Sequence, residues 1–232
     1  GANLSDMVRG GIPVPDGFII CSCAYREAVE AGGASGAILD ILARTDVTDA
    51  EQLNEASARI KGLIKALEIP AALRSEVVVA YNRLAGAESN LPLVAVRSSS
   101  TAEDLGAASC AGQQETFLNV RGEEALLEKV RDCWASLYNP QAIFYRRRHG
   151  FDESRVGIAV VVQRMVEPVK SGVLFTVHPV LKDRTAMMIE AVWGLGEGIV
   201  SGLITPDNYV ISKRDGSLIS QYVSVKTKMV VK

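Results

Sequence analysis

The sequence has little of several features that mark specialised classes of protein. Aromatic residues make up only 6% of the chain, and there are just four cysteines and two histidines. Neither sign of charge prevails, since 25 basic and 27 acidic residues leave a net charge of −2. The chain therefore lacks the basic surplus typical of proteins that bind nucleic acid or anionic membranes, and we expect neither as a partner.

Long apolar runs are also missing. The longest covers residues 156–162, whereas a membrane-spanning helix needs about 20 apolar residues. Hydrophobic residues nevertheless make up 48% of the 232 residues, enough for one large domain or two lobes with a sizeable core. The composition predicts a well-buried globular protein.

The cysteines follow no recognisable framework. Cys21, Cys23, Cys110 and Cys133 match neither a disulfide-rich scaffold nor a zinc site, and one residue separates the first two where metal and redox pairs usually have two. The pattern indicates reduced thiols, and we expect a cytoplasmic protein.

Hydrophobic periodicity predicts helices in the first part of the chain. A strand is expected at residues 18–21, with Ser22 placed to cap the helix after it. Residues 38–84 and 123–138 have apolar side chains at helical spacing, and Thr48 with Glu51 forms a capping box inside the first of these ranges.

The pattern changes to strands from residue 156. Short apolar runs typical of strands occupy residues 156–163, 172–177, 186–191, 209–212 and 217–225. Asp215 and Gly216 are a strong hairpin turn between the last two. Helices followed by a mostly antiparallel sheet predict an α+β fold with two lobes, at about residues 1–150 and 151–232.

Residues 94–119 hold the clearest chemical signal. Apolar runs suited to strands flank about twenty small or polar residues. An irregular segment of this length inside a compact domain usually has a function, such as ligand binding. Arg97 has a planar guanidinium that matches phosphate oxygens, next to the hydroxyls of Ser98, Ser99, Ser100 and Thr101. Small residues such as Gly112 let backbone N–H groups approach a ligand closely. We interpret the stretch as a polyphosphate site; a solvated serine-rich loop fits the composition equally well.

Two other places in the sequence have weaker indications of a binding site. Gln163 and Met165 end a predicted strand, where a backbone edge and an adaptable apolar side chain suit an adenine ring. An ordinary strand end explains these residues as well, and the residues alone favour it. The cluster at residues 146–149, Arg-Arg-Arg-His, is interpreted as solvated surface at a helix end rather than as a nucleic-acid patch.

The string VAVRSSSTAEDLGAASCAGQQETFLNV, residues 94–120, resembles a known signature. It is similar to the nucleotide-binding domain shared by phosphoenolpyruvate synthase (pyruvate, water dikinase), pyruvate phosphate dikinase and rifampicin phosphotransferase. That domain has the ATP-grasp fold, which holds its nucleotide between two lobes. The helical string at residues 38–64 looks more like phosphoenolpyruvate synthase than like the other two.

The resemblance implies roles for individual residues. Arg97 would be a phosphate ligand with a catalytic role, and Gly112 and Thr116 would belong to a loop that closes over the phosphates. Gln163 would contact the adenine side, together with the residues just after it, such as Met165.

The implied cofactors are ATP and Mg²⁺. The family's metal-binding strands and a second phosphate-binding arginine would lie beyond residue 232, and a phosphate-binding lysine would lie before residue 1. We therefore expect the metal site outside this chain.

The resemblance also implies an activity for a complete enzyme. Such an enzyme converts ATP, pyruvate and water to phosphoenolpyruvate, AMP and phosphate through a phosphohistidine on a swivelling domain, and binds pyruvate at a separate domain. Neither His149 nor His178 matches the carrier motif, so both domains are expected elsewhere and the chain alone is expected to be inactive. An antibiotic as acceptor, or phosphate in place of water, are the alternatives within the family. A non-catalytic nucleotide-binding module is an alternative of another class.

Overall fold

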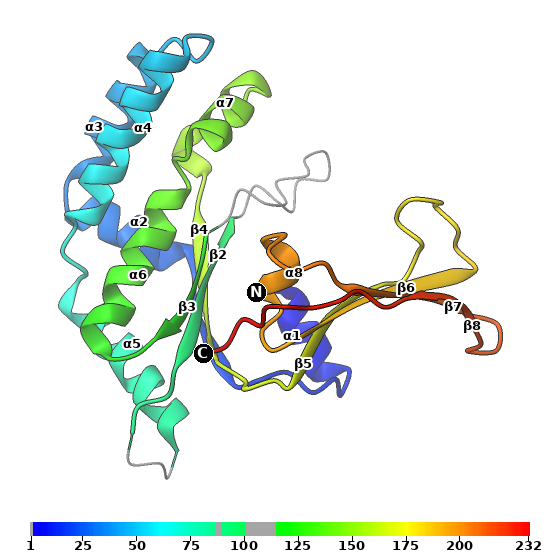
Figure 1. Cartoon of the computed structure of the whole chain (residues 1–232). Helices are drawn as coiled ribbons and strands as arrows, with labels where there is room; N and C mark the ends of the chain where they lie inside the picture. The colour runs from blue at the N-terminus through cyan, green and yellow to red at the C-terminus, as the bar shows by residue number, and fades with distance from the viewer. Residues whose placement is uncertain (1, 87–89, 101–114) are drawn as a thin grey trace. The chain divides into compact units, whose positions relative to one another are not determined.

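The structure is a computed structural model that describes residues 2–86, 90–100 and 115–232. The chain divides into two compact units, Gly1–Met165 and Val166–Lys232. Both contain antiparallel sheets, and helices account for much of the first, so the predicted α+β class is confirmed (Figure 1). Within the described residues, no helix is both long and apolar enough to span a membrane.

The first unit contains most of the helices and one four-stranded sheet. Its elements are α1 (Ala2–Arg9), β1 (Gly17–Ile20), α2 (Ser22–Ala31), α3 (Ala34–Arg44), α4 (Ala50–Lys65), α5 (Ala71–Ala85), β2 (Val94–Ser100), β3 (Thr116–Val120), α6 (Glu123–Ser136), α7 (Pro140–Arg148), the 3₁₀ turn η2 (Glu153–Arg155) and β4 (Ile158–Arg164).

The strand order of this sheet is β1-β4-β2-β3, and every pairing is antiparallel. β4 therefore lies between strands that come much earlier in the chain, which extends the first unit to Met165. The change from helical to strand periodicity marks where β4 begins, but it carries no information about the sheet in which β4 pairs.

One face of the sheet supports the hydrophobic core. Val94 and Val96 of β2 are fully buried, as is Trp134 of α6. Helices α2, α5 and α6 contact the sheet, and α3 and α4 pack outside them (Figure 1). The helical spacing of apolar side chains in residues 123–138 predicts an inward stripe, which is confirmed because α6 and its C-cap bury all of these residues: Leu126, Leu127, Val130, Trp134 and Leu137.

Two predicted caps are wrong. The N-cap of α4 is Asp49, whose carboxylate accepts hydrogen bonds from the N–H groups of Glu51 and Gln52 at 2.9 and 3.2 Å. Thr48 instead donates its hydroxyl to Asp46. Ser22 is the first residue of α2 and Cys21 is its N-cap. Several residue types suit the N-cap position, so the sequence alone does not show which of two adjacent polar residues occupies it.

The second unit is a meander with strand order β5-β6-β7-β8. Its elements are β5 (Lys170–Phe175), β6 (Ala186–Trp193), α8 (Glu197–Val200), β7 (Asp207–Ser212) and β8 (Leu218–Tyr222). The predicted hairpin turn at Asp215 and Gly216 is confirmed. Gly216 has a φ of +72°, and the Asp215 carboxylate accepts from the N–H and hydroxyl of Ser217.

The cysteine prediction is wrong for one pair. A disulfide joins Cys21 and Cys23, although a spacing of one residue is unusual for a redox pair. Cys133 is free and buried, and burial raises the pKa of its thiol. Cys110 lies outside the described residues.

The prediction for the basic cluster is wrong for Arg146. This side chain is only 3% exposed and forms an ion pair with Glu153, while Arg147, Arg148 and His149 are exposed as predicted. Successive side chains on a helix point about 100° apart. Four consecutive residues therefore point in different directions, and here Arg146 is the one that faces the protein interior.

Candidate functional site

The strand register places three of the predicted site residues on one face of the first sheet. Arg97 of β2 pairs with Val161 of β4 on one side and with Thr116 of β3 on the other. Ala95 pairs with Gln163, two residues along each strand. Because side chains alternate between the faces of a sheet, Arg97, Thr116 and Gln163 share the face opposite the helical core.

Arg97 and Gln163 are diagonal neighbours on this face, which corresponds to a separation of about 7–8 Å between their positions. Arg97 is exposed and, within the part of the chain that the structure describes, forms no ion pair. A guanidinium without a carboxylate partner keeps its full capacity to bind an anion. Among the described residues, this face therefore offers a cation outside any ion pair, a short distance from an amide.

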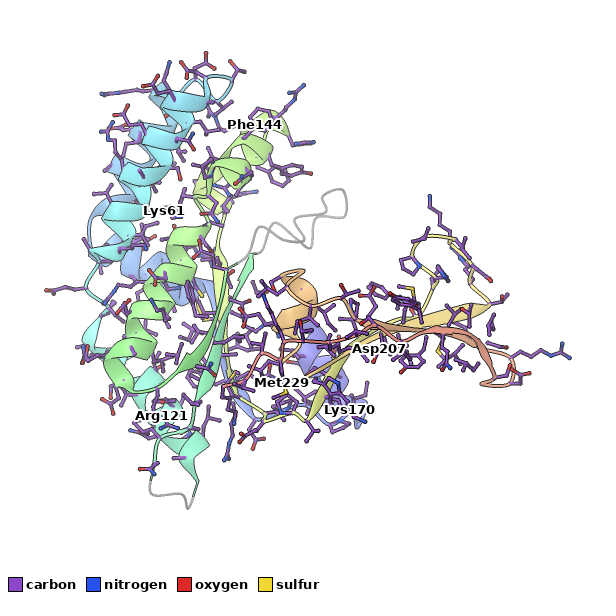
Figure 2. The ribbon with its side chains drawn as sticks, viewed as in Figure 1. Lys61, Arg121, Phe144, Lys170, Asp207 and Met229 are labelled. Carbon is purple, nitrogen blue, oxygen red and sulfur yellow. A yellow bond between two sulfur atoms is a disulfide. The ribbon has the colours of Figure 1, made fainter. Side chains whose placement is uncertain are left out.

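Thr116 is exposed at the start of β3 and directly opposite Arg97. Its position is fixed by the residue before it. The carbonyl of Glu115 accepts from the backbone N–H and the hydroxyl of Ser98, at 3.1 and 3.2 Å. Lys61 lies on α4 (Figure 2), and its ammonium is 3.7 Å from the Glu115 carboxylate. These contacts fix the backbone at Glu115, immediately before the residue that pairs with Arg97.

Ser98 does not serve the predicted anion site. It is buried on the helical side of β2, where its hydroxyl is committed to Glu115. In an alternating strand, consecutive serines cannot all reach one ligand. Gly112 and Thr101 lie outside the described residues.

Gln163 is half-buried and tied to the turn before β1. Its side-chain amide donates to the carbonyl of Pro15 at 3.2 Å, and Gly17 pairs with it across the strands. A cavity of about 290 Å³ opens here between the sheet face and α1. Its wall includes Leu4 and Val8 of α1 together with Gln163. Apolar walls with a few fixed polar groups are typical of small-molecule sites.

Gly17 is required where it stands. A β-carbon on this residue would lie 2.4 Å from the carbonyl oxygen of Val162 and 3.1 Å from the Cα of Gln163. In the sequence, Gly17 follows Pro13 and Pro15 and indicates only a turn. Its contact with β4 depends on the strand order, so no local signal could have revealed it.

Met165 follows β4 and is partly exposed. Its N–H donates to the carbonyl of Leu93 at 2.8 Å, and the N–H of Arg164 donates to Asp16 at the same distance. The main-chain donors at this strand end are thus used within the protein. An adenine base at this strand end would therefore have to form its hydrogen bonds with carbonyl groups here or with later residues, because these two N–H groups are already donated.

The histidines have structural contacts. His149 stacks on Tyr145 at 4.1 Å between ring centroids, and a nitrogen of His178 accepts from the N–H of Leu181. Among the described residues, no group of three or more histidine, cysteine, aspartate or glutamate side chains is arranged to hold a metal ion.

Comparison with known proteins identifies the family. Residues 1–232 match the family model described as pyruvate phosphate dikinase, AMP/ATP-binding domain. The chain belongs to this family. The resemblance first noticed in residues 94–120 therefore extends over the whole sequence.

The most similar curated relatives of this AMP/ATP-binding domain include several archaeal proteins. A probable phosphoenolpyruvate synthase of Methanocaldococcus jannaschii is 43% identical and covers 100% of this chain. Those of Methanothermobacter thermautotrophicus and Archaeoglobus fulgidus are 46% and 50% identical and cover 99% and 92% of it. The chain spans only 20%, 34% and 28% of these three relatives, respectively.

Proposed function

We propose that this chain is the ATP-binding part of a phosphoenolpyruvate synthase. The observation that carries the proposal is the common face of Arg97, Thr116 and Gln163, residues that come from three separate stretches of the sequence. The identity of 43–50% to relatives of that name supports the choice within the family.

Each residue receives a role that its chemistry fits. The Arg97 guanidinium offsets negative charge on the phosphates and on the phosphoryl group as it is transferred. Thr116 donates a further hydrogen bond, and Gly112 admits the backbone close to phosphate oxygens. Gln163 and Met165 border the adenine side, where the cavity between α1 and the sheet gives apolar contact.

We further propose that the two units are the lobes of an ATP-grasp domain in a longer cytoplasmic polypeptide. In that polypeptide, Mg²⁺ ligands would lie outside this chain. A phosphohistidine on a swivelling domain would receive phosphate from ATP and pass it to pyruvate bound elsewhere, with AMP and inorganic phosphate released. The chain alone would bind ATP weakly or not at all, and it would not complete this reaction.

The test uses the complete enzyme that contains this chain. Arg97→Ala should lower ATP-dependent labelling of the carrier histidine by roughly 10²–10³-fold, because losing one well-placed donor to a developing charge commonly has an effect of that size. Arg97→Lys should restore part of the labelling, since it keeps the charge but loses the planar fork.

Arg121→Ala is the matched control. Arg121 is also exposed and follows β3 at the end opposite Thr116 (Figure 2). Labelling should stay near normal in this variant. Near-normal labelling in Arg97→Ala as well would remove Arg97 from the site.

A further inference from the structure

We propose that Cys21 and Cys23 form a site of reversible thiol–disulfide exchange with small thiols. The two cysteines are bonded in the structure, with 5.3 Å between their Cα atoms, within the range that disulfides adopt without moving the backbone. The proposal is independent of nucleotide binding, because it concerns a covalent modification at the junction of β1 and α2.

The pair is open to reagents. Both cysteines are exposed and border a cavity of about 300 Å³ between β1, α2 and α5. The cavity also has Leu73 and two carboxylates, Glu27 and Glu76, in its wall. A thiol of the size of a short peptide can therefore reach the sulfur atoms without unfolding of the protein.

The position of the pair in the fold favours Cys21 as the sulfur that leaves when the disulfide is reduced. This residue is the N-cap of α2, and no side chain makes a capping hydrogen bond there. A thiolate at a helix start is stabilised by the positive end of the helix dipole, which makes it a better leaving group. Cys21 should accordingly be the sulfur that leaves when a thiol attacks Cys23.

The reaction balances with two equivalents of a monothiol. The first thiolate attacks Cys23, forms a mixed disulfide with it and breaks the bond to Cys21, which leaves as a thiolate and takes a proton. The second thiolate attacks the sulfur of the first, so that Cys23 leaves and is protonated. The protein gains two electrons and two protons, and the reductant becomes a symmetrical disulfide.

Cys133 provides an internal reference. It is fully buried in the core, and burial raises the pKa of its thiol. Both properties make it inert toward exchange in the native protein. Any reagent that modifies Cys133 therefore reports unfolding rather than access to the proposed site.

The experiment measures labelling across a redox series. The 232-residue chain carrying Cys110→Ser is equilibrated with mixtures of reduced and oxidised glutathione and then treated, while folded, with N-ethylmaleimide. Mass spectrometry of the tryptic peptide with residues 10–26 should show no label at the oxidising end and two labels at the reducing end. A reduced portion that is returned to oxidising glutathione before the maleimide is added should again give the unlabelled peptide.

Single variants separate a true pair from two independent thiols. In Cys21→Ser and in Cys23→Ser, the remaining thiol has no partner, so it should take one maleimide under reducing conditions and one glutathione under oxidising conditions. Two labels on the unsubstituted pair at every glutathione ratio would overturn the proposal. So would a need to unfold the protein, reported by labelled Cys133, before the pair is reduced.

Discussion

At the scale of single residues, burial decides what a charged side chain does. Arg146 belongs to an arginine run but points inward, where it donates to both carboxylate oxygens of Glu153 at 3.2 and 3.1 Å and to the carbonyl of Leu137 at 2.6 Å. Its guanidinium also lies 5.5 Å from the ring centre of Tyr138. One terminal nitrogen has no partner among the described residues. The residue joins α7, η2 and the end of α6.

We predict that Arg146→Ala lowers the free energy of unfolding by about 3–5 kcal/mol, because it leaves the Glu153 carboxylate buried without a counter-charge. Urea denaturation followed by circular dichroism would measure the change. Arg147→Ala is the control, since this neighbour is exposed and should change stability by less than about 0.5 kcal/mol. Equal effects from the two substitutions would contradict the assigned role.

The same scale gives a test of the close contact between β1 and β4. Gly17→Ala should destabilise the protein by about 1–3 kcal/mol, because the added methyl group meets backbone atoms of β4 that cannot move aside. Gly36→Ala changes a glycine inside α3 that has nothing within 4 Å of its would-be β-carbon, and it should stabilise by about 0.5–1 kcal/mol. Thermal unfolding of the two variants should therefore shift in opposite directions.

At the scale of elements, ion pairs fix how the helices pack. Asp132 of α6 lies 2.8 Å from both Lys129, on the same helix, and Lys65, at the end of α4. Burial works against ionisation of Asp132, but the two ammonium groups outweigh it and hold the pKa of this carboxyl below its usual value. The charged form thus links α4 to α6.

A pH dependence follows from the sign of this shift. Because the folded state lowers the pKa, the stabilisation is fully present above the ordinary pKa of aspartate, about 3.9, and is lost as pH falls through the lowered value. Asp132→Asn should therefore destabilise at pH 7, and its effect should shrink progressively as the pH falls below about 3.9. Urea unfolding midpoints of the unsubstituted chain and of Asp132→Asn, measured across this pH range, would test the prediction. A difference between the two midpoints that does not change with pH would contradict the assignment.

At the scale of the whole molecule, the two units differ in how much core they possess. The large hydrophobic cluster consists only of residues from the first unit. In the second unit, the buried apolar residues are few: Ala186, Met188, Val192, Leu195 and Ile204. Several of its apolar side chains are strongly exposed, among them Val180 at 80% and Val225 at 91%. A sheet of this size with so small a core is at best marginally stable alone.

We expect residues 1–165 to fold as a separate protein and residues 166–232 not to. Circular dichroism should show cooperative unfolding for the first segment and little or none for the second. Limited proteolysis of the full chain should likewise cut residues 166–232 first. Independent cooperative folding of the second segment would show that its core suffices after all.

Much of the fold could be predicted because its signals are local. The strands, the stripe of α6 and the turn at Gly216 follow from periodicity and turn chemistry within a few residues. The caps at Asp49 and Cys21 were missed because adjacent polar residues compete for one position. Arg146 was missed because a run of three arginines does not show which of them faces inward.

The candidate site divides in the same way. Arg97, Thr116 and Gln163 could be selected from the sequence, since their chemistry and their motif are local, but nothing in it says that they share a face. That arrangement depends on the β1-β4-β2-β3 order, which pairs residues far apart in the chain. The sequence by itself determined the secondary structure, the family and the chemical types at the site. Only the tertiary structure decided their common face and the need for glycine at position 17, because both depend on contacts between strands that lie far apart in the chain. The structure also decided the pairing of Cys21 with Cys23, which depends on how the local backbone orients two cysteines only two residues apart.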